Sequence, residues 1–183
     1  MTARPGYAQA LQATRLLELL QAYDPHVAGT PPLGVDLPSS DIDILCHAPD
    51  TLAFTRTVWE ALAEAPAFSI HQWTGGGRPM VATFTAQGWC FEIFASIQPV
   101  AEQAGWRHYL AERRLLTLGG EPFRSSVMHH RRAGLKTEPA FAAALRLKGD
   151  PYQALIELGQ REDGHLQVLL AAAGYPAPIA QRE

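Results

Sequence analysis

The stretch Ser40-Asp41-Ile42-Asp43-Ile44-Leu45-Cys46 decides the fold of this chain. Its first half alternates polar and apolar residues, which is the period-two pattern of a β-strand with one buried face. Asp41 and Asp43 then point to one side of the strand, and the apolar residues point to the other. Two adjacent carboxylates with no basic residue between them repel each other, and a divalent cation would relieve that repulsion. The stretch therefore predicts a buried strand with a metal site on one face.

A third acidic residue, Glu92, interrupts the strand-like run Trp89-Cys90-Phe91-Glu92-Ile93-Phe94. One explanation is an edge strand on which Glu92 faces solvent or pairs with an arginine such as Arg107. The other is that Glu92 joins Asp41 and Asp43 at one site. Mg²⁺ takes few protein ligands and leaves positions for triphosphate oxygens, so three carboxylates and a nucleotide would complete a site for phosphoryl transfer.

The rest of the sequence predicts an α+β fold, a mixed β-sheet with flanking helices followed by an all-helical module. Helices are expected at residues 7–23 and 50–65, and strands at residues 26–28, 41–46, 68–73, 80–85 and 89–95. Beyond residue 98 the strand signals end, and helices are expected at residues 100–118 and 122–132 and from helix starts at Thr137, Asp150 and Asp163. We predict two domains, an α/β core at residues 1–98 and a helical module at residues 99–183 packed on it.

Composition narrows the possible classes of protein. The chain has 183 residues, of which 47% are hydrophobic, enough for a well-packed core. A formal charge of −3 gives no basic footprint for nucleic-acid binding. Cys46 and Cys90 lie in strand-like runs without ligand spacing, so we expect both to be reduced core residues. Without an apolar leader or a membrane-spanning run, the sequence predicts a soluble, cytoplasmic protein.

The order Gly29-Thr30, a spacer, Asp41-x-Asp43 and an acid on a later strand resembles the DNA polymerase beta-like nucleotidyltransferase superfamily. The pattern of that superfamily is Gly-Ser, a spacer, Asp-x-Asp or Asp-x-Glu, and a third carboxylate. Nearly the whole chain is also similar to the bacterial domain-of-unknown-function family 4269, through residues 23–50, 103–112, 136–141 and 149–152.

The resemblance implies a nucleotidyltransferase-like fold and a Mg²⁺- or Mn²⁺-dependent transfer of a nucleoside monophosphate from an NTP to an acceptor. The implied catalytic residues and metal ligands are Asp41, Asp43 and Glu92. The implied nucleotide-binding residues are Gly29, Thr30, Ser40, Arg107, His108 and Lys136. A small-molecule or protein acceptor is favoured over nucleic acid because of the acidic balance of the chain.

The loop after Gly29 departs from the superfamily pattern. Thr30 replaces the usual serine, and prolines at residues 31, 32 and 38 resist the helix that normally follows. A nucleotide-sensing module without turnover is therefore an alternative function. A toxin–antitoxin-type modifier of protein or RNA is another.

The expected cationic residues also have simpler explanations. His108 and Glu112 stand one helical turn apart and would form a surface ion pair. Lys136 precedes a helix start and would be solvated. The run at residues 129–132, His-His-Arg-Arg, is best explained as a solvated helix end, since adjacent residues face different ways on a helix.

Overall fold

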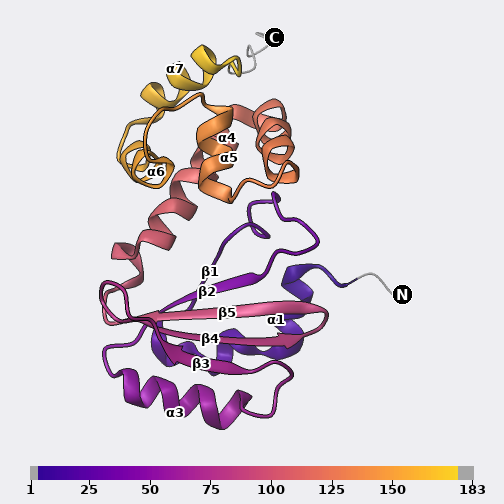
Figure 1. Cartoon of the computed structure of the whole chain (residues 1–183), viewed down its shortest axis with the longest axis vertical. Helices are drawn as coiled ribbons and strands as arrows, with labels where there is room; N and C mark the ends of the chain where they lie inside the picture. The colour runs from indigo at the N-terminus through magenta and orange to yellow at the C-terminus, as the bar shows by residue number, and fades with distance from the viewer. Residues whose placement is uncertain (1–3, 177–183) are drawn as a thin grey trace, which may run out of the picture. The chain divides into compact units, whose positions relative to one another are not determined.

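The computed structural model describes residues 4–176, which include a five-stranded sheet with the strand order β1-β2-β5-β4-β3 (Figure 1). The strands are β1 (His26–Ala28), β2 (Ile42–His47), β3 (Ser69–Gln72), β4 (Met80–Ala86) and β5 (Trp89–Ser96). β2 and β5 pair in parallel, and the other three pairs are antiparallel. The predicted mixed sheet is confirmed.

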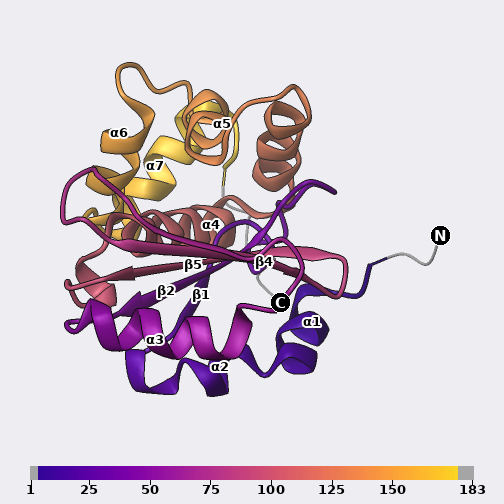
Figure 2. The same cartoon turned by 60° about the horizontal axis from the view of Figure 1, so that its bottom comes forward.

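Helices α1 (Tyr7–Thr14), α2 (Leu16–Leu19) and α3 (Thr51–Leu62) cover one face of this sheet, together with the 3₁₀ turn η1 (Gln21–Tyr23) (Figure 2). Alternate residues of the two central strands point into the core beneath them, and Ile42, Ile44 and Ile93 have no exposed surface. α3 begins where expected, because the carboxylate of Asp50 accepts hydrogen bonds from the first free backbone N–H groups of the helix. One face of the sheet is therefore entirely committed to packing.

The single helix expected at residues 7–23 is wrong, because the chain breaks at Arg15. Arg15 adopts a left-handed φ of 50°, which ends α1 and starts α2 in a new direction. Ala10 before the break and Leu16 and Leu20 after it are all fully buried. The bend lets both segments present apolar side chains to the same core, so burial outweighs the cost of the unfavourable φ.

Contacts divide the chain into two compact units, residues 1–106 and residues 107–183. We call them the sheet unit and the helical unit. The first unit also contains the 3₁₀ turn η2 (Val100–Glu102) and the start of α4 (Ala104–Arg132), and α5 (Thr137–Ala144), α6 (Pro151–Gly159) and α7 (Asp163–Ala173) follow. The division falls within α4, whereas the strand signals of the sequence end at residue 98.

The helical unit is held by its own aromatic core. Phe123 and Phe141 are fully buried and meet edge to face with ring centroids 5.7 Å apart. Within α4, Gly120 has a φ of 61° and a ψ of −160°, so the two helices expected around residues 119–120 are joined through a kink that only glycine adopts easily. None of the helices within residues 4–176 is long and apolar enough to cross a membrane.

Candidate functional site

The three acidic residues singled out by the sequence lie together on the sheet face opposite α1, α2 and α3. Asp43 on β2 and Glu92 on β5 are direct partners in the parallel register. Partners on adjacent strands point to the same face, and Asp41 precedes Asp43 by two residues and so shares its phase. Ile42 between them faces the core with no exposed surface. Strand phase and register therefore bring residues far apart in the sequence to one face.

Electrostatics agree with this placement. Burial raises the pKa of the half-buried Glu92, the nearby charge of Asp41 raises it further, and His71 opposes the shift. The pKa of the Cys90 thiol is raised by desolvation and by Asp41, Glu92 and Asp43. All three carboxylates thus raise the pKa of the same thiol. The result is a concentration of negative charge that a cation would neutralise.

Cys90 itself corrects the expectation of two core cysteines. Cys46 is fully buried, and desolvation raises its pKa to about 12. Cys90 is exposed, because it occupies the same phase of β5 as Glu92. Local apolar composition suggested burial, but the phase of the strand decides which cysteine is covered.

Gly29 packs directly against one of the acids. Its φ is +74°, and a Cβ placed there would lie 1.9 Å from Oδ2 of Asp43 and 2.9 Å from Cγ. A side chain at position 29 would therefore occupy the space of the carboxylate. Only glycine satisfies both the left-handed backbone and this close approach.

The loop between Gly29 and β2 contains turns and no helix, as its prolines predicted. Its two ends are joined by side chains, because Oγ1 of Thr30 donates to Oγ of Ser40 at 3.1 Å. The same Ser40 oxygen accepts from the backbone N–H of Leu37 at 2.9 Å. A hydroxyl has two lone pairs and one proton, so Ser40 keeps its proton for a further acceptor such as a phosphate oxygen.

A row of hydroxyl groups continues from the acids across the sheet, and the sequence reasoning missed it. In the strand register Thr83 is the partner of Glu92, and Ser69 is the partner of Thr83. The Ser69 and Thr83 hydroxyl oxygens are 2.9 Å apart. The signal was present in β4, where threonines alternate with apolar residues, but only the register shows that this row abuts Glu92.

The donor set suits a hard divalent cation, since carboxylate oxygens are the ligands that Mg²⁺ and Mn²⁺ take in proteins. The packing of Gly29 on Asp43 also fits such an ion, and so does the pKa of Glu92, which is raised first by burial and then by the charge of Asp41. Over residues 4–176, however, no three His, Cys, Asp or Glu side chains converge closely enough to form a ready-made cage. A bound ion would therefore require rotation of these side chains toward one another.

The three nucleotide-binding residues expected from the second half of the chain have different environments in the helical unit. Arg107 is half-buried and Lys136 is exposed just ahead of α5. His108 is buried, its Nε2 lies 3.0 Å from the carbonyl oxygen of Tyr152, and its Nδ1 lies 3.4 Å from Oε1 of Glu138. Both ring nitrogens of His108 thus have partners within its own unit.

The expected surface ion pair of His108 with Glu112 is wrong. Glu112 is only 4% exposed, and its Oε1 has no hydrogen-bond partner. Burial raises its pKa well above the ordinary value, Glu138 raises it further, and Arg131 opposes the shift. The i,i+4 spacing was correct, but this face of α4 turns into the helical unit rather than into solvent.

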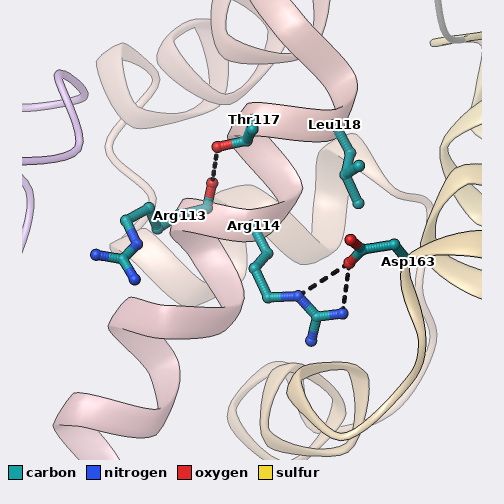
Figure 3. A pocket seen from close by; sticks show the side chains of 5 residues that line it. All are labelled: Arg113, Arg114, Thr117, Leu118 and Asp163. Atoms are coloured by element: carbon teal, nitrogen blue, oxygen red, sulfur yellow. Dashed lines mark hydrogen bonds and ion pairs between the residues drawn. The ribbon is translucent and has the colours of Figure 1, made fainter.

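A shallow pocket of about 100 Å³ lies elsewhere in the helical unit (Figure 3). Arg114 points across it to Asp163, with Nε at 3.1 Å from the carboxylate, and Nη1 donates to the carbonyl oxygen of Gly159 at 2.9 Å. The pocket contains none of the catalytic, metal-binding or nucleotide-binding residues predicted from the sequence. Since its central arginine is already paired, we assign it a role in packing.

The two units differ in charge. Residues 1–106 contain ten acidic residues, four arginines and no lysine, a formal charge of −6. Residues 107–183 contain eight acidic and eleven basic residues, a formal charge of +3. The overall value of −3 conceals this division.

Solved structures of several known proteins are similar to this chain in fold. Similar solved structures include the Cid1 poly(U) polymerase with Mg 3′-dATP bound (15% identity, TM-score 0.55, covering 81% of this chain and 46% of that chain). They also include a cytoplasmic RNA terminal U-transferase (16%, 0.51, 81% and 42%) and the GLD-2/RNP-8 complex (10%, 0.53, 90% and 73%). The chain spans about half the length of the first of these, and the likeness establishes the fold.

The chain belongs to the family described as Domain of unknown function (DUF4269), whose profile matches residues 9–158. The resemblance inferred from the sequence is confirmed, and so is the α+β fold with a helical C-terminal part. No curated protein matches the chain.

Proposed function

We propose that this protein is a nucleotidyltransferase that uses Mg²⁺ or Mn²⁺ to transfer a nucleoside monophosphate from an NTP to an acceptor, which displaces pyrophosphate from the α-phosphate. The observation that supports this most is the pairing of Asp43 with Glu92 in the parallel register, with Asp41 in the same phase and Gly29 against the Asp43 carboxylate. The fold class agrees, and similar structures have been solved with Mg-bound nucleotides.

Each residue has a proposed role. Asp41, Asp43 and Glu92 would hold the ions, which supply charge neutralisation at the phosphates. Glu92 would also take the proton of the attacking acceptor group, a role suited to a carboxyl whose pKa is raised. The Ser40 hydroxyl would donate to a phosphate oxygen, with Thr30 holding it in place, and Gly29 would allow close approach of the backbone.

The remaining residues expected to bind the nucleotide belong to the helical unit. A triphosphate keeps negative charge beyond what the metal neutralises, and the sheet unit has four arginines and no lysine. We propose that Arg107 and Lys136 bind the phosphates, and that His108 belongs to the same nucleotide-binding set. His108 would act there as a group already oriented by Tyr152 and Glu138.

We propose an acceptor that is a small molecule or protein rather than a nucleic acid. Beside Glu92 the sheet face continues with the hydroxyl groups of Thr83 and Ser69 and the imidazole of His71, which suit a neutral or amino-bearing hydroxyl compound. The phosphodiester backbone of a nucleic-acid acceptor would bring negative charge beyond that of the NTP beside three carboxylates and would be repelled. An RNA acceptor is the competing outcome in the test.

The test begins with binding. Asp43→Asn should abolish the thermal stabilisation by NTP with Mg²⁺ or Mn²⁺, while the unliganded variant remains at least as stable as the wild type, because one of several repelling carboxylates is neutralised. Glu60→Gln, an exposed acid of α3, is the matched control. A lower melting temperature of unliganded Asp43→Asn would instead assign that carboxylate a structural role.

Transfer is then measured with each of the four α-³²P-labelled NTPs and three acceptor pools, namely small molecules, proteins and RNA. Arg107→Ala and Lys136→Ala should each weaken binding and transfer by about tenfold or more, as for a lost charge-assisted contact of about 1.5–3 kcal/mol. Label in RNA alone would refute the acceptor proposal.

A nucleotide-sensing module is the second candidate. The observation in its favour is the remodelled loop, in which no helix follows Gly29 and the Thr30 hydroxyl is already bonded to Ser40. Binding of NTP without transfer to any pool, with either metal, would select the sensor over the enzyme.

A further inference from the structure

Arg4 binds the end of the loop that leads into β2. Its Nη1 donates to the carbonyl oxygens of Pro38 at 2.9 Å and Ser40 at 3.2 Å. Its Nη2 donates to the carbonyl oxygen of Leu37 at 2.9 Å. One guanidinium therefore connects three backbone carbonyls within four consecutive residues, directly before the first acid of the site.

The same guanidinium is fixed from its other side. Its Cζ lies 3.4 Å from the ring centroid of Trp89, and the indole Nε1 of Trp89 donates to the carbonyl oxygen of Pro5 at 2.9 Å. Nη2 also lies 3.4 Å from the carboxylate of Asp36. Arg4 is thus held between the loop and the first residue of β5, and its side chain is only 24% exposed.

Arg4 adds donors to a loop in which the Ser40 N–H already donates to the Leu37 carbonyl. Its prolines have no N–H to donate, and the carbonyls at residues 37, 38 and 40 precede the first strand residue, Ile42. Arginine presents five N–H donors in one rigid plane, so a single side chain can fix several carbonyls relative to one another. The compact ammonium of lysine cannot reproduce both that geometry and the stacking on Trp89.

We propose that Arg4 is a positioning residue for the acidic site. It holds the Ser40 carbonyl, so it sets the peptide that joins Ser40 to Asp41, and through the Ser40 hydroxyl it also sets the end of the loop that Thr30 contacts. The orientation of a proposed metal ligand and of a proposed phosphate donor thus depends on a residue outside the sheet. The link to nucleotide binding rests on the proposed function, whereas the restraint on the loop does not.

The test uses Arg4→Ala, Arg4→Lys and the control Arg15→Ala, which removes another sheet-unit arginine from a surface pair with Glu18. Hydrogen exchange is measured at the Ser40 amide, which donates to the Leu37 carbonyl, and at the Leu37 amide, which donates to the Ser40 hydroxyl. We expect exchange at both amides to rise at least tenfold in the two Arg4 variants and to stay unchanged in the control.

The affinity of the same proteins for ATP, GTP, CTP and UTP is measured by thermal shift in the presence of Mg²⁺ or Mn²⁺. We expect the apparent Kd to rise at least tenfold in both Arg4 variants, with no recovery in Arg4→Lys and no change in Arg15→Ala.

Unchanged exchange at the loop amides in Arg4→Ala would overturn the inference, whatever the protein binds. Faster exchange with unchanged NTP affinity would also overturn it, because the loop would then be held without positioning the site. Full recovery of NTP affinity in Arg4→Lys would overturn it as well, because the guanidinium plane and its stacking on Trp89 would then not be needed. If the wild type binds no NTP with either metal while the loop loosens in the variants, the proposed function fails and the restraint by Arg4 stands.

Discussion

Substitution of Gly29 by alanine gives the sharpest test of the site geometry. The new Cβ would lie 1.9 Å from Oδ2 of Asp43, and ordinary contact begins near 3.4 Å. The carboxylate must therefore move by about 1.5 Å or the loop must shift. The first change displaces a proposed metal ligand from its place beside Glu92, and the second displaces the loop that carries Thr30.

The loss of folding stability in Gly29→Ala has two contributions. Alanine at a φ of +74° loses about 1–2 kcal/mol relative to glycine. Rotation of the Asp43 side chain away from its preferred rotamer adds about 0.5–1.5 kcal/mol. The sum of about 1.5–3.5 kcal/mol corresponds to a fall in melting temperature of roughly 3–14 °C for a chain of this size.

Gly77→Ala is the matched control. Gly77 lies in the turn between β3 and β4, has the same φ of +74°, and would place its Cβ at least 4 Å from any other atom. It should lose only the backbone term, about 1–2 kcal/mol, and keep full metal-dependent NTP stabilisation. Gly29→Ala should lose more stability and all of that stabilisation.

A double-mutant cycle with Asp43→Ala isolates the collision. Once the carboxylate is removed, Gly29→Ala should cost no more than Gly77→Ala, because only the backbone term remains. Equal costs for Gly29→Ala with and without the Asp43 carboxylate would refute the close packing. Undiminished NTP stabilisation in Gly29→Ala would refute its relevance to the site.

Three further outcomes are expected. Saturating Mg²⁺ should speed alkylation of Cys90 by iodoacetamide, because the pKa of this thiol is raised by desolvation and then by the three carboxylates, whose field the ion offsets, and the buried Cys46 should stay unmodified as an internal control; an unchanged rate would argue against an ion at the acids. Glu92→Gln should stabilise the unliganded protein at neutral pH, since a carboxyl with a raised folded-state pKa costs stability once it ionises, and thermal melts should show the gain vanishing as pH falls below the ordinary glutamate value. Glu112→Gln should do the same for the helical unit, so the wild type loses stability as pH rises from the ordinary glutamate pKa through the raised one, whereas the exposed Glu157→Gln should leave that slope intact.

Features set by local chemistry were predicted correctly from the sequence. The alternation around Asp43 gave the phase of β2, and Asp50 and Asp150 cap α3 and α6 with the expected side-chain hydrogen bonds. Gly88 marks the turn between β4 and β5, where it and Gln87 have a positive φ that glycine adopts without strain. These signals are carried by a few consecutive residues, so a sequence contains them directly.

Features set by long-range pairing were not predicted from the sequence. The row that joins Glu92 to Thr83 and Ser69 depends on a register between strands that no local pattern encodes. The burial of Glu112 depends on which face of α4 packs inward, and the role of Arg4 depends on a loop more than thirty residues later. The sequence identified the acids, and the tertiary structure supplied what surrounds them.

The position of β5 has a consequence for how the molecule is made. It is the last strand within residues 4–176, and it lies between β2 and β4 in the middle of the sheet. Until it emerges from the ribosome, the β1-β2 and β3-β4 hairpins have no common partner, and each exposes an open edge to other chains. Such non-local closure is intrinsically slow. Pairing of β5 with β2 and β4 joins the hairpins and brings Glu92 beside Asp43, so a nascent fragment that lacks this strand also lacks the third carboxylate of the site.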